Sequence, residues 1–495
     1  MRMSSRPGAH RKRIGGLALG ASIVLSGTAV SRLGAGTPTP SAPDREVALT
    51  PPAAMPSERT PALPAELLRP GATFALAQVV DIALANSPLT RASYGRARSA
   101  AADLGSKRGA YFPQVDGAAN LGRAKQPQLD ATGHPVGNQP VTAYGPAATL
   151  SYLLFDFGGR GGKVEEARQN LLAADWQHNA TIHDVAFGVQ EAYFDYLTAK
   201  AQLAAARKTF DQAQASLDAA NTRHDSGVAT IADVLVARTA LAQAELNVEG
   251  IDGQVLALRG ALATAMGLPA DVPLDIGSLP SEVPLDRARA AVAGLIADAR
   301  LGRPDLAALR AQAAKAAAHV SSVRAEGLPS LALRAEANRT YYRAAGLDAH
   351  LDAWSAGLQL SVPLFYGFSK TYDVRRARED AAVARAQAES YEQLVILQVW
   401  TGYYGLETAT QRVRTSQALL TSATQSEQVA LARYKEGVGT VLDLLSAQAA
   451  LATARAQEIQ ARSDWFVAVA RLAHDSGRLM PSGDIAVVTE EKKEK

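Results

Sequence analysis

Two periodicities alternate along the chain, and each predicts a different kind of element. Strict alternation of apolar and polar residues, which is typical of a strand with one apolar face, occupies four short segments. Long stretches without proline and rich in helix-forming residues lie between them. The pattern predicts strands at about 113–123, 144–156, 330–341 and 353–363, and helices at about 76–85, 89–110, 164–224, 231–266, 288–300, 305–326, 369–436 and 441–476. We therefore expect a mainly α fold with a small antiparallel β part.

The predicted strands form two hairpins, each with an apolar and a polar face. In the last strand Trp354, Leu358 and Leu360 alternate with small or polar residues. Leu150 and Tyr152 show the same alternation in the second strand. Side chains two positions apart point to the same side of a strand. The sequence thus predicts that these five side chains lie on the apolar faces of the hairpins.

The chain is internally duplicated. The stretch RHDSGVATIADVLVARTALAQA at 223–244 returns as RYKEGVGTVLDLLSAQAALATA at 433–454, with a constant offset of 210 residues and no gap. A repeat of this kind indicates two copies of one long unit. We expect a first repeat at 71–267, a linker at 268–285 and a second repeat at 286–477. In each repeat, two shorter helices are expected to stack end to end beside one long helix.

The amino terminus has the composition of a secretory signal peptide. Five basic residues and no acidic one precede an apolar run, and we place the cleavage site near residue 29. Loss of residues 1–29 changes the formal net charge from +3 to −2, which argues against a nucleic acid partner. Residues 30–70 form a Pro-rich disordered leader and residues 478–495 a charged tail. The chain has no cysteine, which excludes disulfides and a lipid-modified amino-terminal Cys.

Four strands with an apolar face cannot close a membrane barrel alone, because free edges would leave backbone groups unsatisfied in lipid. Two chains would supply eight strands, whose interior is filled by side chains, whereas three would supply 12 and begin to leave a channel. Aromatic residues cluster where strands meet helices, either as a core plug or as an interfacial girdle of a membrane barrel. They are Tyr111, Phe112, Phe155, Phe157, Phe365, Tyr366 and Phe368.

The duplicated helix–hairpin–helix plan, the LFDFG and LFYGF junctions and the repeated turn R(Y/H)xxGVxT(I/V)xD(V/L)L resemble the TolC family of outer-membrane efflux proteins over about residues 72–477. The resemblance implies a homotrimer in the cell outer membrane. Its 12-stranded β-barrel would be embedded in outer-membrane lipid and continue into a long periplasmic α-helical tunnel. It also implies two partners, a periplasmic adaptor (membrane fusion) protein and an inner-membrane pump. The implied function is a passive export duct that carries substrates to the exterior.

The repeated turn carries the remaining candidate residues. Asp233 and Asp443 each follow a Thr by three residues at a helix start, which is the spacing of a capping box. The resemblance adds a second role, in which three copies of each Asp line a pore constriction that disfavours anions. Gly439 and Ser446 stand where family members carry a basic and a second acidic residue, which implies a looser gate. The residues that the resemblance assigns to an adaptor-docking tip are Gly227, Val228, Thr230, Tyr434, Gly437, Val438 and Thr440.

Catalytic motifs lack the context that they need. The triplet at 156–158 matches a kinase metal motif, but no catalytic loop or Gly-rich lid accompanies it. His178 and His183 are five residues apart, so they do not share a helix face well, and no zinc signature accompanies them. We therefore expect no enzymatic activity, no cofactor and no metal. The alternative function is a periplasmic coiled-coil scaffold without a pore, which membrane fractionation would distinguish from a duct.

Overall fold

The computed structural model describes most of the chain between Thr73 and Leu479. The described residues are 73–125, 128–129, 135–137, 140–280, 282–285, 291–344 and 347–479. All of them belong to the second of the two units into which the chain divides, Pro40–Lys495. The predicted signal peptide, the Pro-rich leader, residues 480–495 of the predicted tail and the start of the predicted helix at 288–300 lie outside the described residues.

The two halves of the chain share the order of two shorter helices, two long strands, a 67-residue helix and a 35-residue helix, and the first half contains additional short elements. The first contains β1 (Thr73–Phe74), α1 (Leu76–Asn86), α2 (Pro88–Arg108), the 3-10 turn η2 (Gly109–Tyr111), β2 (Gln114–Lys125), β3 (Gln128–Leu129), β4 (Pro135–Gly137), β5 (Pro140–Phe155), α3 (Gly159–Asp225), α4 (Ile231–Ala265) and β6 (Asp275–Ile276). The second contains α5 (Val292–Gly302), α6 (Pro304–Ala325), β7 (Ser330–Ala344), β8 (Leu347–Ser361), α7 (Ser369–Lys435) and α8 (Val441–Asp475). The mainly α fold with a small antiparallel sheet is confirmed.

The long helix α3 begins at Gly159, five residues earlier than the sequence predicts. The glycines at 158–162 favour a loop by propensity alone. The Asp156 carboxylate, however, accepts a hydrogen bond from the Arg160 backbone N–H at 2.6 Å. Gly158 also has a positive φ of 89°, which lets the chain turn from strand into helix. Local capping therefore outweighs the low helix propensity of these glycines.

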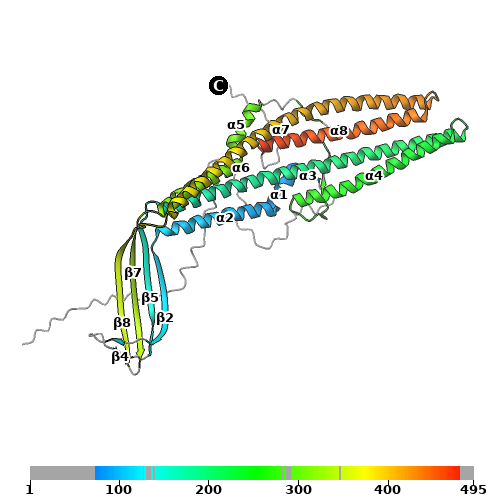
Figure 1. The fold of residues 1–495 in the computed structure, drawn as a ribbon. Coiled ribbons are helices and arrows are strands. Elements are labelled where there is room, and N and C mark those ends of the chain that lie inside the picture. Colours follow the sequence, from blue (N-terminus) through cyan, green and yellow to red (C-terminus); the bar gives the residue numbers. More distant parts are fainter. Residues whose placement is uncertain are drawn as a thin grey trace, which may run out of the picture. The chain divides into compact units, whose positions relative to one another are not determined.

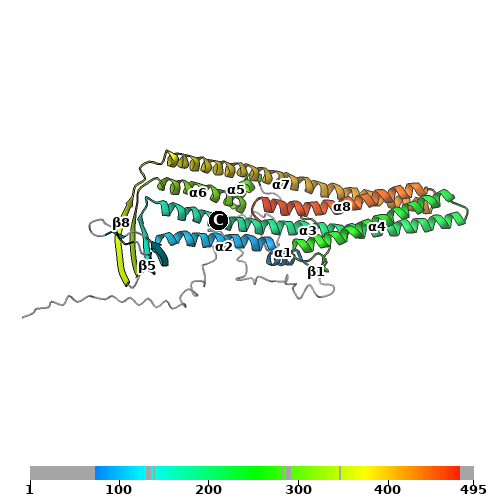
Figure 2. The same cartoon turned by 60° about the horizontal axis from the view of Figure 1, so that its bottom comes forward.

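Two 67-residue helices, α3 and α7, organise the helical part. Helices α2 and α4 pack on α3, α6 and α8 pack on α7, and α3 contacts α6 and α8, which joins the two repeats. Figures 1 and 2 show α2 and α4 following one another along α3, as the sequence predicts. At 1.5 Å per residue, α3 spans about 100 Å between the sheet and the α3–α4 turn. None of the helices in the described ranges is long and apolar enough to cross a membrane.

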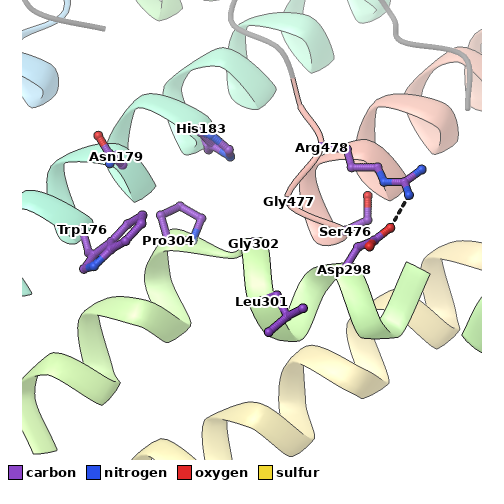
Figure 3. A pocket seen from close by; sticks show the side chains of 10 residues that line it. All are labelled: Trp176, Asn179, His183, Asp298, Leu301, Gly302, Pro304, Ser476, Gly477 and Arg478. Carbon is purple, nitrogen blue, oxygen red and sulfur yellow. Dashed lines mark hydrogen bonds and ion pairs between the residues drawn. The ribbon is translucent and has the colours of Figure 1, made fainter. Parts of the chain in front are cut away.

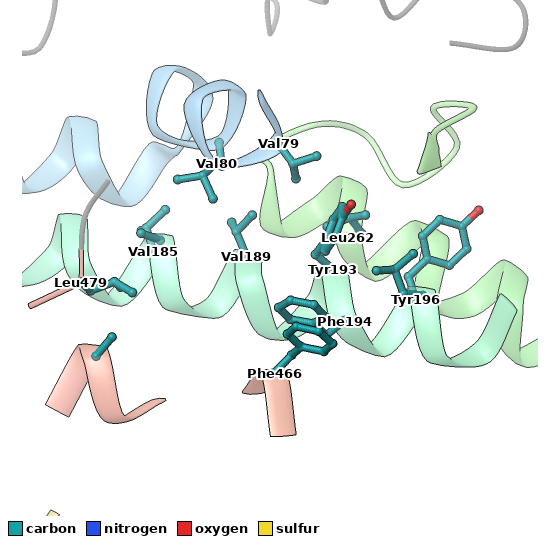
Figure 4. Packing of buried hydrophobic residues seen from close by; sticks show 14 of the residues in the cluster. Val79, Val80, Val185, Val189, Tyr193, Phe194, Tyr196, Leu262, Phe466 and Leu479 are labelled. Carbon is teal, nitrogen blue, oxygen red and sulfur yellow. The ribbon is translucent and has the colours of Figure 1, made fainter. Parts of the chain in front are cut away.

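The largest hydrophobic cluster lies in the middle part of α3. Residues spaced by three or four positions on α3 share one face, and Val185, Val189 and Tyr193 pack there against Val79 and Val80 of α1. Figure 4 also shows the aromatic contact that ties α3 to α8. The rings of Phe194 and Phe466 are stacked, with centroids 5.2 Å apart and planes within 5°. Both repeats therefore share one core.

We expect replacement of the stacked Phe466 by Ala to destabilise the junction of the two repeats by about 3–5 kcal/mol, because it leaves a cavity against Phe194. Amide hydrogen exchange of α8 and the Tm of the purified protein would both report the loss. Phe466→Leu, which keeps most of the volume, is the matched control and should cost less than about 1.5 kcal/mol. Equal losses for the two variants would contradict the packing role.

Candidate functional site

The four long strands form one antiparallel sheet in the order β2-β5-β7-β8. Its register aligns residues in rows across the strands. One row, for example, joins Val115, Leu150, Ala335 and Ala356. Residues in one row point to the same side of the sheet, and neighbouring rows alternate between sides. The register therefore decides which side chains share a face.

One side of the sheet, which we name the apolar face, collects most of the large apolar residues of the four strands. It contains the odd-numbered residues of β2 and β7 and the even-numbered residues of β5 and β8. The structure brings together on this face all five strand residues that the sequence singles out, Leu150, Tyr152, Trp354, Leu358 and Leu360. Trp354 is 81% exposed and both leucines of β8 are 66% exposed. No described part of the chain covers them.

The opposite side, which we name the polar face, carries hydrophilic side chains. In one row Asp116 aligns with Thr149, Glu336 and Ser355. The adjacent row on the same face contains Arg334, opposite Ser151. A sheet with one apolar and one polar face fits a wall between lipid and water.

The aromatic residues at the junction of sheet and helices are all exposed, from Tyr111 at 44% to Phe365 at 72%. Phe155 contacts Phe157 with ring centroids 4.7 Å apart, and Phe365 contacts Phe368 at 5.5 Å. A register shift at residue 154 pairs Phe155 with Leu331 of the apolar face. The core-plug interpretation is therefore wrong within this chain, because Phe112, Tyr366 and the other members of this junctional aromatic group have no core around them.

A second aromatic group, which sequence reasoning missed, lies near the other end of the sheet. Tyr144 and Tyr341 are register partners with stacked rings, and their centroids are 5.3 Å apart. His350 aligns with Tyr341 on the next strand. We name these three residues the distal aromatic row. The sequence contains these aromatic residues, but only the register between β5 and β7 places Tyr144 beside Tyr341.

The two helical turns at the far end of α3 and α7 have the same geometry. Gly227 and Gly437 adopt φ values of +76° and +79° where α3 and α7 end. The N–H of Gly437 donates to the Tyr434 carbonyl and the N–H of Val438 to the Arg433 carbonyl, which satisfies the last carbonyls of α7. Residues other than glycine rarely adopt a positive φ, so a substitution at either position would strain the backbone. Val228 and Val438 point outward and are 67% and 69% exposed.

Each turn is followed by a reciprocal cap, as the sequence predicts. The Asp443 N–H donates to Thr440 Oγ1 at 3.1 Å, and the Thr440 N–H donates to Asp443 Oδ2 at 3.2 Å. Thr230 and Asp233 make the equivalent pair, at 3.3 Å and 2.9 Å. Hydrogen bonds from the Thr440 side chain and backbone hold the pKa of Asp443 below its ordinary value. Both acids therefore lie at fixed positions beside the turns.

A cation–π contact joins the two turns to each other. Arg223 of α3 donates from Nη1 to the Tyr434 carbonyl at 2.6 Å, and its guanidinium lies 4.8 Å from the centre of the Tyr434 ring. Tyr434 is only 5% exposed, and burial raises the pKa of its hydroxyl. Its side chain is thus a packing group in this chain, which corrects its prediction as part of a docking surface. Arg223 is the partner that sequence reasoning did not single out.

A pocket on α3 lies where the α5–α6 junction and the segment after α8 meet it (Figure 3). Trp176, Asn179 and His183 line it from α3, and Arg478 forms an ion pair with Asp298 on its opposite side. Burial, together with the positive charge of nearby His474, lowers the pKa of His183 to about 4. The other histidine of this pair, His178, does not line the pocket, and its Nδ1 lies 2.8 Å from Ser93 Oγ of α2. Within the described ranges no group of residues could hold a metal ion.

Next to this pocket, His474 of α8 lies between two carboxylates. Its Nδ1 is 3.0 Å from Asp475 Oδ1 and its Nε2 is 3.1 Å from Asp184 Oδ1 of α3. Burial alone would lower the pKa of His474, but these two hydrogen bonds raise it to about 9. A protonated His474 therefore links the end of α8 to α3.

We expect the stability of this junction to fall as the pH rises through the pKa of His474. Because the folded pKa of about 9 exceeds the ordinary value of 6.5, the contribution is complete below about pH 6.5 and disappears by about pH 9. The loss is about 3 kcal/mol. Burial raises the pKa of Asp175 to about 7, so Asp175 affects stability up to about pH 8, and His183 does so only at lower pH; measurements between pH 8 and 9.5 therefore isolate His474.

The measurement is the Tm of the purified protein against pH in that window. In the variant His474→Gln the decline should disappear, since an amide does not titrate there. An unchanged slope in the variant would show that another group is responsible.

Comparison with known proteins identifies the family. The model of the outer membrane efflux protein family matches residues 79–268 and 295–478, which is more than half of the chain. Protein CyaE of Bordetella pertussis is 30% identical over 394 residues, covering 78% of this chain and 80% of CyaE. The pyoverdine export outer membrane protein OpmQ of Pseudomonas aeruginosa is 26% identical over 399 residues, covering 78% of this chain and 81% of OpmQ.

Solved structures show the same fold. The outer membrane protein VceC of Vibrio cholerae superposes with a TM-score of 0.72 at 20% identity, covering 81% of this chain and 96% of that chain. The outer-membrane channel OprN superposes with a TM-score of 0.72 at 21% identity, covering 82% of this chain and 90% of that chain. The predicted relation to TolC-type proteins is thus confirmed. The two matched segments, one in each repeat, show that the chain belongs to the outer membrane efflux protein family.

Proposed function

We propose that three copies of this chain join their sheets into a 12-stranded barrel in the outer membrane, and that the barrel opens into an α-helical tunnel that passes substrates outward. The observation that carries the proposal is the two-faced sheet with an aromatic group at each end of its apolar face. The duct is passive and not an enzyme, and its energy comes from partner proteins. Relatives that are named as efflux and export proteins support this proposed role.

The spacing of the two aromatic groups supports a membrane barrel. Leu331, the partner of Phe155, and Tyr341 of the distal aromatic row are ten residues apart on β7. Ten residues span about 34 Å along a strand, and a tilt of about 40° reduces this to about 26 Å along the membrane normal. Outer-membrane barrels have an apolar band about 25 Å tall between two aromatic girdles. The junctional group and the distal aromatic row fit the two girdles.

The sheet edges support self-association. In the order β2-β5-β7-β8, strands β2 and β8 are the edges and each lacks a partner on one side within the described sheet. In lipid, these unpaired backbone groups need a partner, and a neighbouring copy can supply one by pairing its β8 with β2. A heterologous contact of this kind closes into a ring when the rotation permits. Three copies are the number that opens a channel, because eight strands would be filled by side chains.

The helical turns are the proposed docking end. Val228 and Val438 expose apolar side chains beside Gly227, Gly437 and the caps at Thr230 and Thr440. A tip of this kind suits an adaptor protein that presents a complementary helical turn, and the adaptor would connect the duct to an inner-membrane pump. Exposed Asp443 and half-buried Asp233, both beside the turns, would form rings of carboxylates around the threefold axis. Such rings favour cations over anions at the constriction.

The scaffold without a pore is the weaker candidate. It requires protein to cover the apolar face, whereas Trp354 and Leu358 are exposed and no described segment lies over them. A scaffold also has no need of charged and amide side chains gathered on the polar face. No comparison supports it.

We expect Trp354→Arg to impair assembly in the outer membrane, because Trp354 lies midway between the two aromatic groups and a cation on the lipid side of a barrel costs about 2–4 kcal/mol near the midplane. Ser355→Arg is the matched control, since Ser355 is the next residue and lies on the polar face. Fractionation of cells that express each variant would give the amount in the outer membrane. Equal amounts of the two variants, or wild-type protein in the soluble periplasmic fraction, would refute the barrel.

We expect the purified protein to conduct ions across a planar bilayer with a preference for cations. Asp443→Asn should reduce this preference and weaken block by divalent cations, while Asp443→Glu should preserve both. The low pKa of Asp443 keeps the carboxylate ionised, so the difference between the variants should persist at mildly acid pH. If Asp443→Asn leaves selectivity unchanged, the aspartates do not form the constriction.

A further inference from the structure

The charged residues at the distal end of the sheet all point to the lipid side. We name this part of the apolar face the outer rim: it runs from the Arg339–Asp352 row through the distal aromatic row to the end of the strands. Its charged members are Arg123, Lys125, Arg339, Arg343, Asp348 and Asp352. Across the same rows, the polar face carries no charged residue in the described strands. A purely hydrophilic hairpin end would place charges on both faces.

Cations predominate on the outer rim. Arg339 donates from Nε and Nη2 to the two carboxylate oxygens of Asp352, at 2.6 and 2.8 Å. Arg343 Nε lies 3.2 Å from Asp348 Oδ1. The side chains of both pairs are at least half exposed, so solvent weakens the pairs and the guanidiniums stay accessible. Arg123 and Lys125 have no acid opposite them, since their register partners are Thr142 and Pro140. Four cations against two acids leave an excess of positive charge.

The position of this charge in the membrane defines its partner. The distal aromatic row marks the upper boundary of the apolar band, and aromatic girdles lie at the level of lipid headgroups. Arg343, Arg123 and Lys125 lie just beyond this boundary and would meet the headgroups of the outer leaflet. Guanidinium groups bind phosphate through two parallel N–H donors. The row of Arg123, Thr142 and Arg343 offers such donors on two strands of one chain.

We propose that the outer rim binds the phosphate groups of phosphorylated glycolipids in the outer leaflet, with Arg123, Lys125 and Arg343 as the phosphate ligands. This rests on the proposed barrel, because only a barrel places the apolar face against lipid. Bound headgroups would fix the height of the barrel in the membrane and seal the lipid around it. Asp348 and Asp352 form ion pairs with Arg343 and Arg339, which restrains these two arginine side chains.

Native mass spectrometry of the detergent-solubilised protein tests the proposal, with lipid A carrying both phosphates as the probe and the same lipid without phosphates as its control. We expect the triple variant Arg123→Gln, Lys125→Gln, Arg343→Gln to bind the phosphorylated lipid about tenfold more weakly. The matched control is Arg334→Gln, which removes an arginine from the polar face of β7 and should bind as wild type does. Millimolar inorganic phosphate should not displace the lipid.

Three results would overturn the proposal: equal binding of the lipid without phosphates, unchanged binding by the triple variant, or an equal loss in Arg334→Gln. Displacement by millimolar inorganic phosphate would also overturn it, because the rim would then be a site for the free ion. Failure of the barrel itself is distinguishable. In that case the wild-type protein would not reach the outer membrane, whereas failure of the rim alone leaves membrane insertion and ion conduction intact.

Discussion

The unpaired edges of the sheet are the constraint on which the rest of the molecule depends. Strands β2 and β8 each present a row of backbone N–H and C=O groups with no partner in the described sheet. In water such an edge invites aggregation, and in lipid it costs several kcal/mol per unsatisfied group. The apolar face beside these edges favours lipid. The sheet can therefore lie in lipid without unsatisfied backbone groups only when copies pair edge to edge. In the proposed trimer one chain would supply one third of a closed barrel, and its exposed Trp354 and Leu358 would face lipid.

The duplicated helices supply the second part of the structure, and the two copies have diverged at one junction. Gly267 and its counterpart Gly477 both have φ near +70° and pack tightly against the α1–α2 and α5–α6 junctions, where the second helix of each pair starts. The residue at that start is Ser87 in the first repeat and Arg303 in the second, and both are 4% exposed. Arg303 pairs with Asp305 and donates to Gln398 of α7. The first junction is therefore held by small-residue packing, whereas the second is held by charges.

Sequence periodicity predicted the helices and strands because each has a local cause, such as the alternation in β8 or the caps at Thr230 and Thr440. The limits of that reasoning have physical reasons too. Charged Arg343 and Asp348 ended the apolar alternation, yet they pair across the hairpin and extend β7 and β8 to Ala344 and Leu347. The distal aromatic row and the Arg223–Tyr434 contact depend on long-range register, which no single segment encodes. Of the candidate residues, the strand set therefore gathered on one face, whereas Tyr434 proved to be buried.

The caps at the turns explain how one aspartate can serve both the fold and the proposed constriction. Asp443 uses Oδ2 to accept the Thr440 N–H, and a carboxylate has about four acceptor positions, so Oδ1 remains free for a passing cation. The cap removes the freedom of the side chain to turn away from the axis, and it keeps the carboxylate ionised by lowering its pKa. Gly439 adds no charge beside it, and Arg433 is the nearby cation whose charge also favours the ionised carboxylate. In the proposed trimer a ring of such acids would owe its selectivity to the caps, because the same two hydrogen bonds that begin α8 would set the charge at the mouth of the duct.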